Sequence, residues 1–234
     1  MPYLFLILFL ILFLIIAVVF ANIMINKENE QIFNKKQVLL EGLTNKDQDT
    51  IVLIGDSILN NSNYILTEGK AVPDLIKTGH PNTYNFAKDD AVVTDCVTQI
   101  EQIPAENNTP QTYIFVSAGG NNILNCHFTI SKEMIETFFQ QYSTLLYSLK
   151  SKFSKAQIHL LTLYYPLESQ FKSLYPFIEQ WNSLLSEFVE KNSDFKLIRT
   201  NKLMNFKADF INSVEPSETG GAKIANTILE TLPN

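Results

Sequence analysis

The sequence predicts an α/β fold, a three-layer sandwich with a parallel, flavodoxin-like sheet of about five strands. From residue 49 onward, short apolar stretches rich in β-branched and aromatic residues alternate with longer amphipathic stretches. Strands covered on both faces have this composition, and regular strand–helix alternation gives a parallel sheet with right-handed crossovers. We therefore expect residues 49–234 to form one domain with helices on both faces of the sheet.

The predicted strands are short apolar runs, as expected for strands covered on both faces. They span Thr50–Ile54, Thr83–Ala87, Thr112–Ser117, Gln157–Leu163 and Phe195–Arg199. The predicted helices show apolar residues at helical spacing and carry start or stop signals such as Ser131 and Pro104. They span Val92–Ile103, Ser131–Phe153, Leu167–Asn192 (interrupted by Pro176) and Ser217–Leu232.

The first 25 residues predict a transmembrane helix that acts as a signal anchor. Every residue from Leu4 to Ala21 is apolar, and no charged side chain precedes Lys27. Eighteen such residues are enough for a helix to cross a bilayer, so we expect residues 3–25 to contact lipid. A cleaved signal peptide is the alternative, but residues 1–3 lack the basic side chains that it needs.

Residues 26–48 are mostly polar, and their apolar residues show no helical or strand periodicity. This composition predicts a juxtamembrane linker. Lys27, Lys35 and Lys36 follow the span, whereas only the terminal amine precedes it. The positive-inside rule then favours a cytosolic domain in a single-pass membrane protein.

Charge and cysteine content exclude several classes of function. The net charge of −6 lies entirely beyond the predicted span and includes no basic stripe, which argues against a nucleic-acid partner. Cys96 and Cys126 are too few for a disulfide framework or a metal site. We expect neither a metal nor a cofactor.

Four polar blocks carry the chemistry, and three of them follow predicted strands. They are Gly55-Asp56-Ser57, Asn85–Ala91, Gly119-Gly120-Asn121 and Asn212–Ser217. The carboxyl ends of parallel strands face the crevice in which open α/β sheets bind ligands. We expect these blocks to meet there.

The order and spacing of the four blocks resemble the SGNH (GDSL-type) hydrolase superfamily over about residues 50–230. The resemblance implies that Ser57 is the nucleophile, and that the Asn121 side chain and the N–H of residue 90 help to hold the oxyanion. The family has a glycine where this chain has Asp90. Glu215 stands at the position of the family's His base, and Asn212 at that of the Asp that orients it. The implied substrate is a small ester or an acylated molecule.

These departures have direct chemical consequences. A carboxylate has an ordinary pKa near 4.3, so Glu215 serves as a base near neutrality only if burial raises its pKa by about two units. The Asp90 carboxylate opposes an oxyanion developing beside it. His127, six residues after Asn121, is a possible alternative base. We expect His159 to lie in a strand core and His80 in an exposed loop.

Each site residue also has a purely structural interpretation. Ser57 could cap a following helix, Gly119-Gly120-Asn121 could be an ordinary strand-to-helix turn, and Glu215 could be a first-turn acid of the last helix. At the level of function, a serine esterase competes with a pseudoenzyme that binds ligands in the same pocket, and with a domain that only presents an interaction surface.

Overall fold

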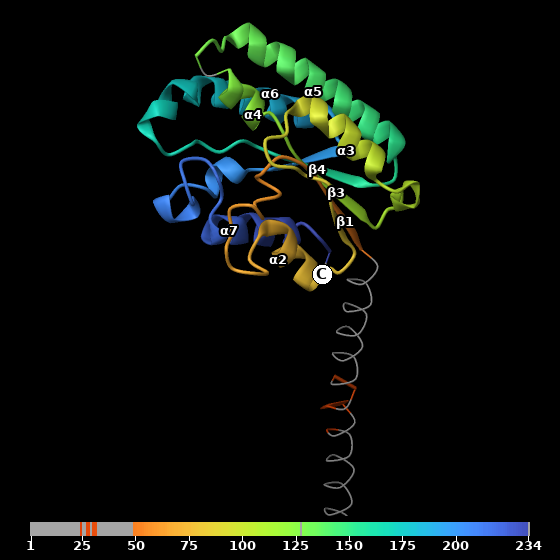
Figure 1. Ribbon diagram of the computed structural model, residues 1–234. Helices are drawn as coiled ribbons and strands as arrows, with labels where there is room; N and C mark the ends of the chain where they lie inside the picture. Colours follow the sequence, from red (N-terminus) through yellow and green to blue (C-terminus); the bar gives the residue numbers. More distant parts are fainter. Residues whose placement is uncertain (1–23, 25–26, 29, 32–48, 127, 234) are drawn as a thin grey trace, which may run out of the picture. The chain divides into compact units, whose positions relative to one another are not determined.

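The computed structural model describes residues 24, 27–28, 30–31, 49–126 and 128–233 (Figure 1). The predicted transmembrane helix and linker lie outside the described residues, apart from the few positions between 24 and 31. No helix in the described ranges is both long and apolar enough to span a membrane. The described residues from Asp49 onward belong to one compact unit, and its fold is considered by itself.

The centre of this unit is a five-stranded parallel sheet. Its strands are β1 (Thr50–Gly55), β2 (Thr83–Asn85), β3 (Thr112–Ser117), β4 (Gln157–Leu161) and β5 (Phe195–Ile198). Their order is β2-β1-β3-β4-β5, with every neighbouring pair parallel. This is the flavodoxin-like order, and it confirms the predicted sheet.

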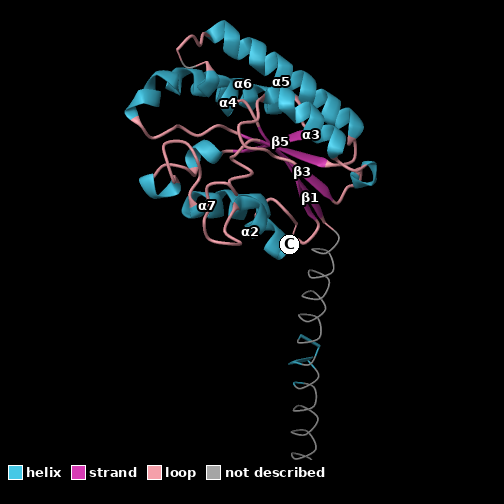
Figure 2. Cartoon of the chain, in the orientation of Figure 1, coloured by secondary structure: helices cyan, strands magenta, loops and turns pink. Residues whose placement is uncertain are grey.

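Helices cover both faces of the sheet, so the fold has three layers (Figures 1 and 2). One face carries α2 (Val72–Gly79) and α7 (Glu218–Leu229), which pack against each other. The other face carries α3 (Cys96–Gln102), α4 (Gly120–Asn125), α5 (Lys132–Lys152) and α6 (Tyr175–Lys191). Ser131 caps α5 as predicted, because its side chain accepts the Met134 N–H.

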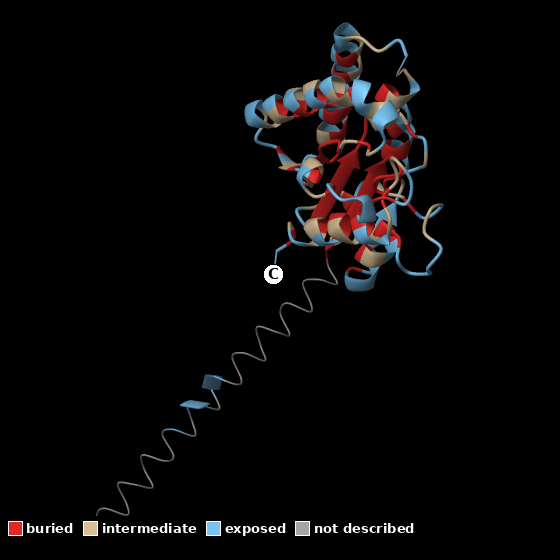
Figure 3. Ribbon diagram, turned by 90° about the vertical axis from the view of Figure 1, so that its left-hand side faces the viewer, coloured by how far each residue is buried: buried red, intermediate tan, exposed pale blue. Residues whose placement is uncertain are grey.

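The core lies on both faces of the central strands β1 and β3, in which every residue except the half-buried Thr50 is buried (Figure 3). Apolar side chains of β1 and β3 such as Leu53 and Phe115 are fully buried, each contributing about 2 kcal/mol of hydrophobic stabilisation. On the α5–α6 side, Phe139, Tyr142 and Trp181 form an aromatic cluster with centroid separations of 5.4–6.2 Å.

Some predicted boundaries need correction. The strands predicted at Thr83–Ala87, Gln157–Leu163 and Phe195–Arg199 end one or two residues earlier. The helix predicted over Leu167–Asn192 is instead a 3-10 segment, Ser169–Leu174, followed by α6, whose first turn contains Pro176. Proline fits there because the first-turn N–H has no partner inside the helix. The short helices α2 and α4 were not predicted.

The strand order places the crevice for ligands between β1 and β3. The chain leaves β1 toward one edge of the sheet and leaves β3 toward the other, so the helices that follow cover opposite faces. Gly55 at the end of β1 pairs in register with Ser117 at the end of β3. The first and third polar blocks therefore begin side by side at this switch point.

Candidate functional site

Ser57 lies in a tight turn directly after β1. The turn begins at Gly55, whose φ of +125° is a left-handed conformation, and a Cβ there would overlap the Ser117 carbonyl oxygen. The amides of Leu59 and Asn60 both donate to the Asp56 carbonyl at 3.1 Å. Ser57 is only 6 % exposed, and its own N–H donates to no residue that the structure describes.

The structural interpretation of Ser57 as the cap of a following helix is wrong. After the turn, the next helix in the described chain is α2, which begins at Val72. Asp56 caps the turn instead by accepting the Ile58 N–H at 3.2 Å.

Two buried amide side chains that the sequence did not single out hold the turn in place. Gln99 of α3 is fully buried, accepts the Gly55 N–H at 2.6 Å and donates to the Gly55 carbonyl at 3.0 Å. Asn61 is also fully buried and donates to the Pro216 carbonyl at 3.1 Å. Asn61 thus connects the turn after Ser57 to the residue that follows Glu215.

Glu215 is presented by a short loop that Asn212 organises. The Asn212 side-chain oxygen accepts the N–H groups of Val214 and Glu215, both at 2.8 Å. The Ile211 N–H donates to the Glu215 carbonyl at 3.0 Å, which closes the loop. Asn212, at the family's orienting position, therefore contacts the backbone of residue 215.

Glu215 is not a first-turn acid of the last helix. That helix, α7, begins at Glu218 and is capped by Ser217, whose side chain accepts the Gly220 N–H. Glu215 lies two residues before the cap. Its carboxylate is therefore free to face the Ser57 turn.

The Glu215 carboxylate lies near the Ser57 hydroxyl. Burial raises the pKa of Glu215 to about 7, the nearby Ser57 hydroxyl lowers it, and the charges of Asp89 and Asp90 raise it further. The Glu215 Oε2 atom is buried and has no hydrogen-bond partner among the described residues. The pKa therefore meets the condition that a carboxylate base must satisfy near neutral pH.

Asp56, next to the serine, is a second carboxyl with a high pKa. It is 2 % exposed, and burial raises its pKa to about 7 despite a 2.9 Å hydrogen bond from the Ser117 hydroxyl. The charge of Glu215 also raises the pKa of Asp56.

Asn121 reaches the same site from the first turn of α4. The turn from β3 into α4 passes through Gly119, whose φ of +103° and contact with Trp181 leave no room for a Cβ. The Asn121 Nδ2 atom donates to the Ala91 carbonyl at 3.0 Å. An amide nitrogen carries two hydrogens, so a second N–H remains for a ligand.

Asp90 adopts the conformation of the glycine whose position it occupies. Its φ of +57° makes it the only non-glycine residue with a positive φ in the described ranges. Its N–H, however, donates to the Asp89 carboxylate at 3.1 Å. The donor that the family resemblance implies at residue 90 is thus already bonded within the chain.

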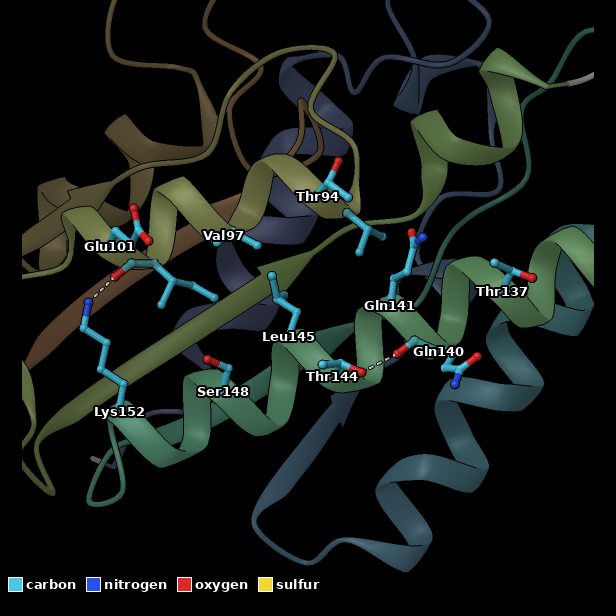
Figure 4. Close-up of a pocket in the computed structure, with 12 residues that line it drawn as sticks. Thr94, Val97, Glu101, Thr137, Gln140, Gln141, Thr144, Leu145, Ser148 and Lys152 are labelled. Carbon is cyan, nitrogen blue, oxygen red and sulfur yellow. Dashed lines mark hydrogen bonds between the residues drawn. The ribbon is translucent and has the colours of Figure 1, made fainter.

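A small cavity of about 40 Å³ lies beside Asp56, Ser57 and Asn121, and neither Glu215 nor Asp90 lines it. Ser57 and Asn121 line it together with a largely apolar wall that includes Ile123, Leu163 and Ile178. A larger hollow of about 740 Å³ lies between α3 and α5 (Figure 4), but none of the predicted site residues lines it. The smaller cavity is the candidate site because the predicted site residues Ser57 and Asn121 line it.

The histidines divide into three cases. His127 lies outside the described residues. His159 is buried in β4 as predicted, and burial lowers its pKa to about 4. The prediction of an exposed His80 is wrong: this residue is 4 % exposed, and its charge affects Asp49 at the opposite end of β1 from Ser57. No group of metal-ligating side chains occurs in the part of the chain that the structure describes.

Solved structures with this fold are lipolytic proteins and esterases. A lipolytic protein of the G-D-S-L family from Veillonella parvula superposes with a TM-score of 0.61 at 18 % identity, over 78 % of this chain and 97 % of that one. An acetyl xylan esterase gives 0.60 at 13 % identity, over 79 % and 100 %. Phospholipase A1 from Streptomyces albidoflavus gives 0.56 at 13 % identity, over 78 % and 98 %. The sequence matches no protein-family model and no curated protein.

Proposed function

We propose that this chain, which has the fold of the SGNH (GDSL-type) hydrolases, is a serine hydrolase of carboxylic esters. The observation that carries the proposal is the proximity of the Ser57 hydroxyl to Glu215, a carboxyl whose pKa is about 7. A serine nucleophile needs a base that accepts its proton and later returns it to the leaving group. A carboxylate with this pKa suits both steps near neutral pH.

In the proposed reaction, Glu215 takes the Ser57 proton while Oγ attacks the ester carbonyl carbon. The Ser57 N–H and the second N–H of Asn121 donate to the oxyanion that forms. The protonated Glu215 then gives its proton to the alcohol oxygen as that bond breaks, which leaves an acyl-serine. Water attacks the acyl-serine by the same proton route and releases the acid.

The size of the cavity favours a short acyl group. A cavity volume of about 10–15 Å³ holds one water molecule. The cavity beside Ser57, at about 40 Å³, therefore accommodates an acetyl or propionyl group but no long acyl chain. We expect kcat/KM to fall steeply from acetyl to octanoyl in a series of esters of one alcohol. An enzyme that prefers the octanoyl ester would contradict this assignment.

Ester hydrolysis by the wild type and by Ser57→Ala tests the proposal. Ser62→Ala is the matched control, because Ser62 is an exposed hydroxyl on the same loop. We expect Ser57→Ala to abolish hydrolysis of a short acyl ester and Ser62→Ala to retain it. Hydrolysis that survives Ser57→Ala would contradict the proposed nucleophile.

One observation favours a second candidate, a binding module without turnover. The Asp90 N–H is engaged by Asp89, and the charges of Asp89 and Asp90 act on Glu215, the proposed base. For such a module, Glu215→His combined with Asn212→Asp should create activity where the wild type has none. Wild-type turnover that depends on Ser57 excludes this candidate.

We also propose, from the sequence alone, that residues 3–25 anchor the protein in a lipid bilayer with the domain in the cytosol. The full chain should then remain in the membrane fraction after alkaline carbonate washing, whereas a chain lacking residues 1–25 should not. Release of the full chain by carbonate would contradict the anchor. Protease added to intact cells tests on which side of the membrane the domain lies: a cytosolic domain should be protected from cleavage.

A further inference from the structure

We propose that Asp89, fixed close to the Ser57 site, makes the site select esters with a cationic alcohol portion over esters with a neutral or anionic one. This inference rests on the proposed ester hydrolysis and concerns its substrate class. Asp89, Asp90 and Glu215 are together called the acidic rim.

The backbone places the acidic rim against the site. The Lys88 N–H donates to the Gly55 carbonyl at 2.9 Å, and the Ala91 carbonyl accepts the Asn121 side chain at 3.0 Å. The segment that carries Asp89 and Asp90 is therefore held at both ends. Its start is bonded to Gly55, two residues before Ser57, and its end to Asn121, the proposed oxyanion donor. Any substrate that reaches Ser57 passes within the field of these carboxylates.

The Asp89 carboxylate is held in one place. Tyr64 donates its hydroxyl to the two Asp89 oxygens at 2.8 Å each, Asn63 donates at 3.3 Å, and the Asp90 N–H donates at 3.1 Å. All of these donors are neutral. They fix the position of the negative charge and do not cancel it.

No cation in the described ranges pairs with the acidic rim. The ion pairs that the structure contains involve other acids, namely Glu187, Asp194 and Asp209. The buried Glu215 Oε2 atom also lacks a donor among the described residues. An uncompensated charge beside a partly buried site attracts cationic ligands and repels anionic ones.

The negative charge of the acidic rim also affects the reaction step in which the oxyanion forms. A negative rim opposes the oxyanion of every ester, and a cationic group on the alcohol portion offsets part of that opposition. The preference should therefore be expressed in kcat/KM and should weaken as salt screens the charges.

The test compares acetylcholine with its uncharged carbon isostere, 3,3-dimethylbutyl acetate, as substrates of the full chain. We expect kcat/KM to be about tenfold higher for acetylcholine at low ionic strength, from Coulomb attraction over several ångströms. The ratio should approach one in 0.5 M salt and in the double variant Asp89→Asn/Asp90→Asn. Asparagine keeps the shape of both side chains and tolerates the positive φ of residue 90.

The control variant Asp74→Asn/Glu106→Gln removes the same charge from two exposed positions, and it should keep the wild-type ratio. A wild-type ratio of one, with hydrolysis of both esters dependent on Ser57, would overturn the charge selection and leave the proposed function standing. Absence of Ser57-dependent hydrolysis of either ester would overturn both. A ratio unchanged in the Asp89/Asp90 variant would also overturn the role of these residues.

Discussion

Glu215→Gln should make the protein less active and more stable at the same time. Glutamine has nearly the shape of glutamate but cannot accept the Ser57 proton. The loop should keep its conformation, because Asn212 and Ile211 contact only the backbone of residue 215. Loss of a general base costs about 10²- to 10⁴-fold in rate, and we expect a fall of this size in kcat/KM at pH 8.

The gain in stability follows from the raised pKa. Glu215 has a pKa of about 7 in the folded protein against an ordinary value of 4.5. Each unit corresponds to about 1.4 kcal/mol, so ionised Glu215 costs about 3 kcal/mol, or about 2 kcal/mol after allowing for its partial exposure. Because the folded pKa is the higher one, the wild type is most stable below pH 4.5. It loses stability as the pH rises toward 7.

The assay pairs ester hydrolysis with urea unfolding of the purified full chain at pH 5 and pH 8. At pH 8, Glu215→Gln should be about 2 kcal/mol more stable than the wild type, and the difference should fall to about 0.5 kcal/mol at pH 5. Unchanged activity at pH 8 would refute the role of Glu215 as base. A variant no more stable than the wild type at pH 8 would refute the calculated cost of burial.

Three further changes test the supports of the site. Asp56→Asn should stabilise the protein by about 4 kcal/mol at pH 8 and by less than about 1 kcal/mol near pH 4, in urea unfolding, because the folded pKa of Asp56 is about 7 and its ordinary value is 3.8. Gln99→Ala should cost about 2–4 kcal/mol in the same assay by removing both hydrogen bonds to Gly55, whereas Ala at the exposed Gln102 of the same helix should cost under about 1 kcal/mol. Asn212→Ala should lower kcat/KM about tenfold by freeing two loop amides, and Asn212→Asp, which keeps the acceptor, should retain activity.

The parallel sheet, and the position of the polar blocks at the carboxyl ends of its strands, could be predicted because both depend on local sequence patterns. Strand composition and strand–helix alternation are enough to predict a parallel sheet. The positions of Ser57 and Asn121 relative to strand ends then follow from topology. The register that aligned Asp90 with the family's glycine is consistent with the positive φ that the structure gives this residue, although that conformation was not predicted.

Features that depend on packing between distant segments could not be predicted from these patterns. Nothing in the spacing indicated that Gln99 would bond both backbone groups of Gly55, or that Asp89 would accept the Asp90 N–H. The buried His80 was predicted to be exposed because its Gly-His-Pro context is typical of a surface loop. The alternative in which Ser57 caps a helix does not hold, because the Asp56 side chain caps a single turn there instead.

Covalent labelling of the nucleophile tests the central claim most directly. A fluorophosphonate probe reacts with a serine only when a base withdraws its proton, so the modified peptide should contain Ser57. The labelling rate should rise as the pH passes through about 7 and fall sharply in Glu215→Gln. Modification of a different residue, or no modification between pH 5 and 9, would contradict the account.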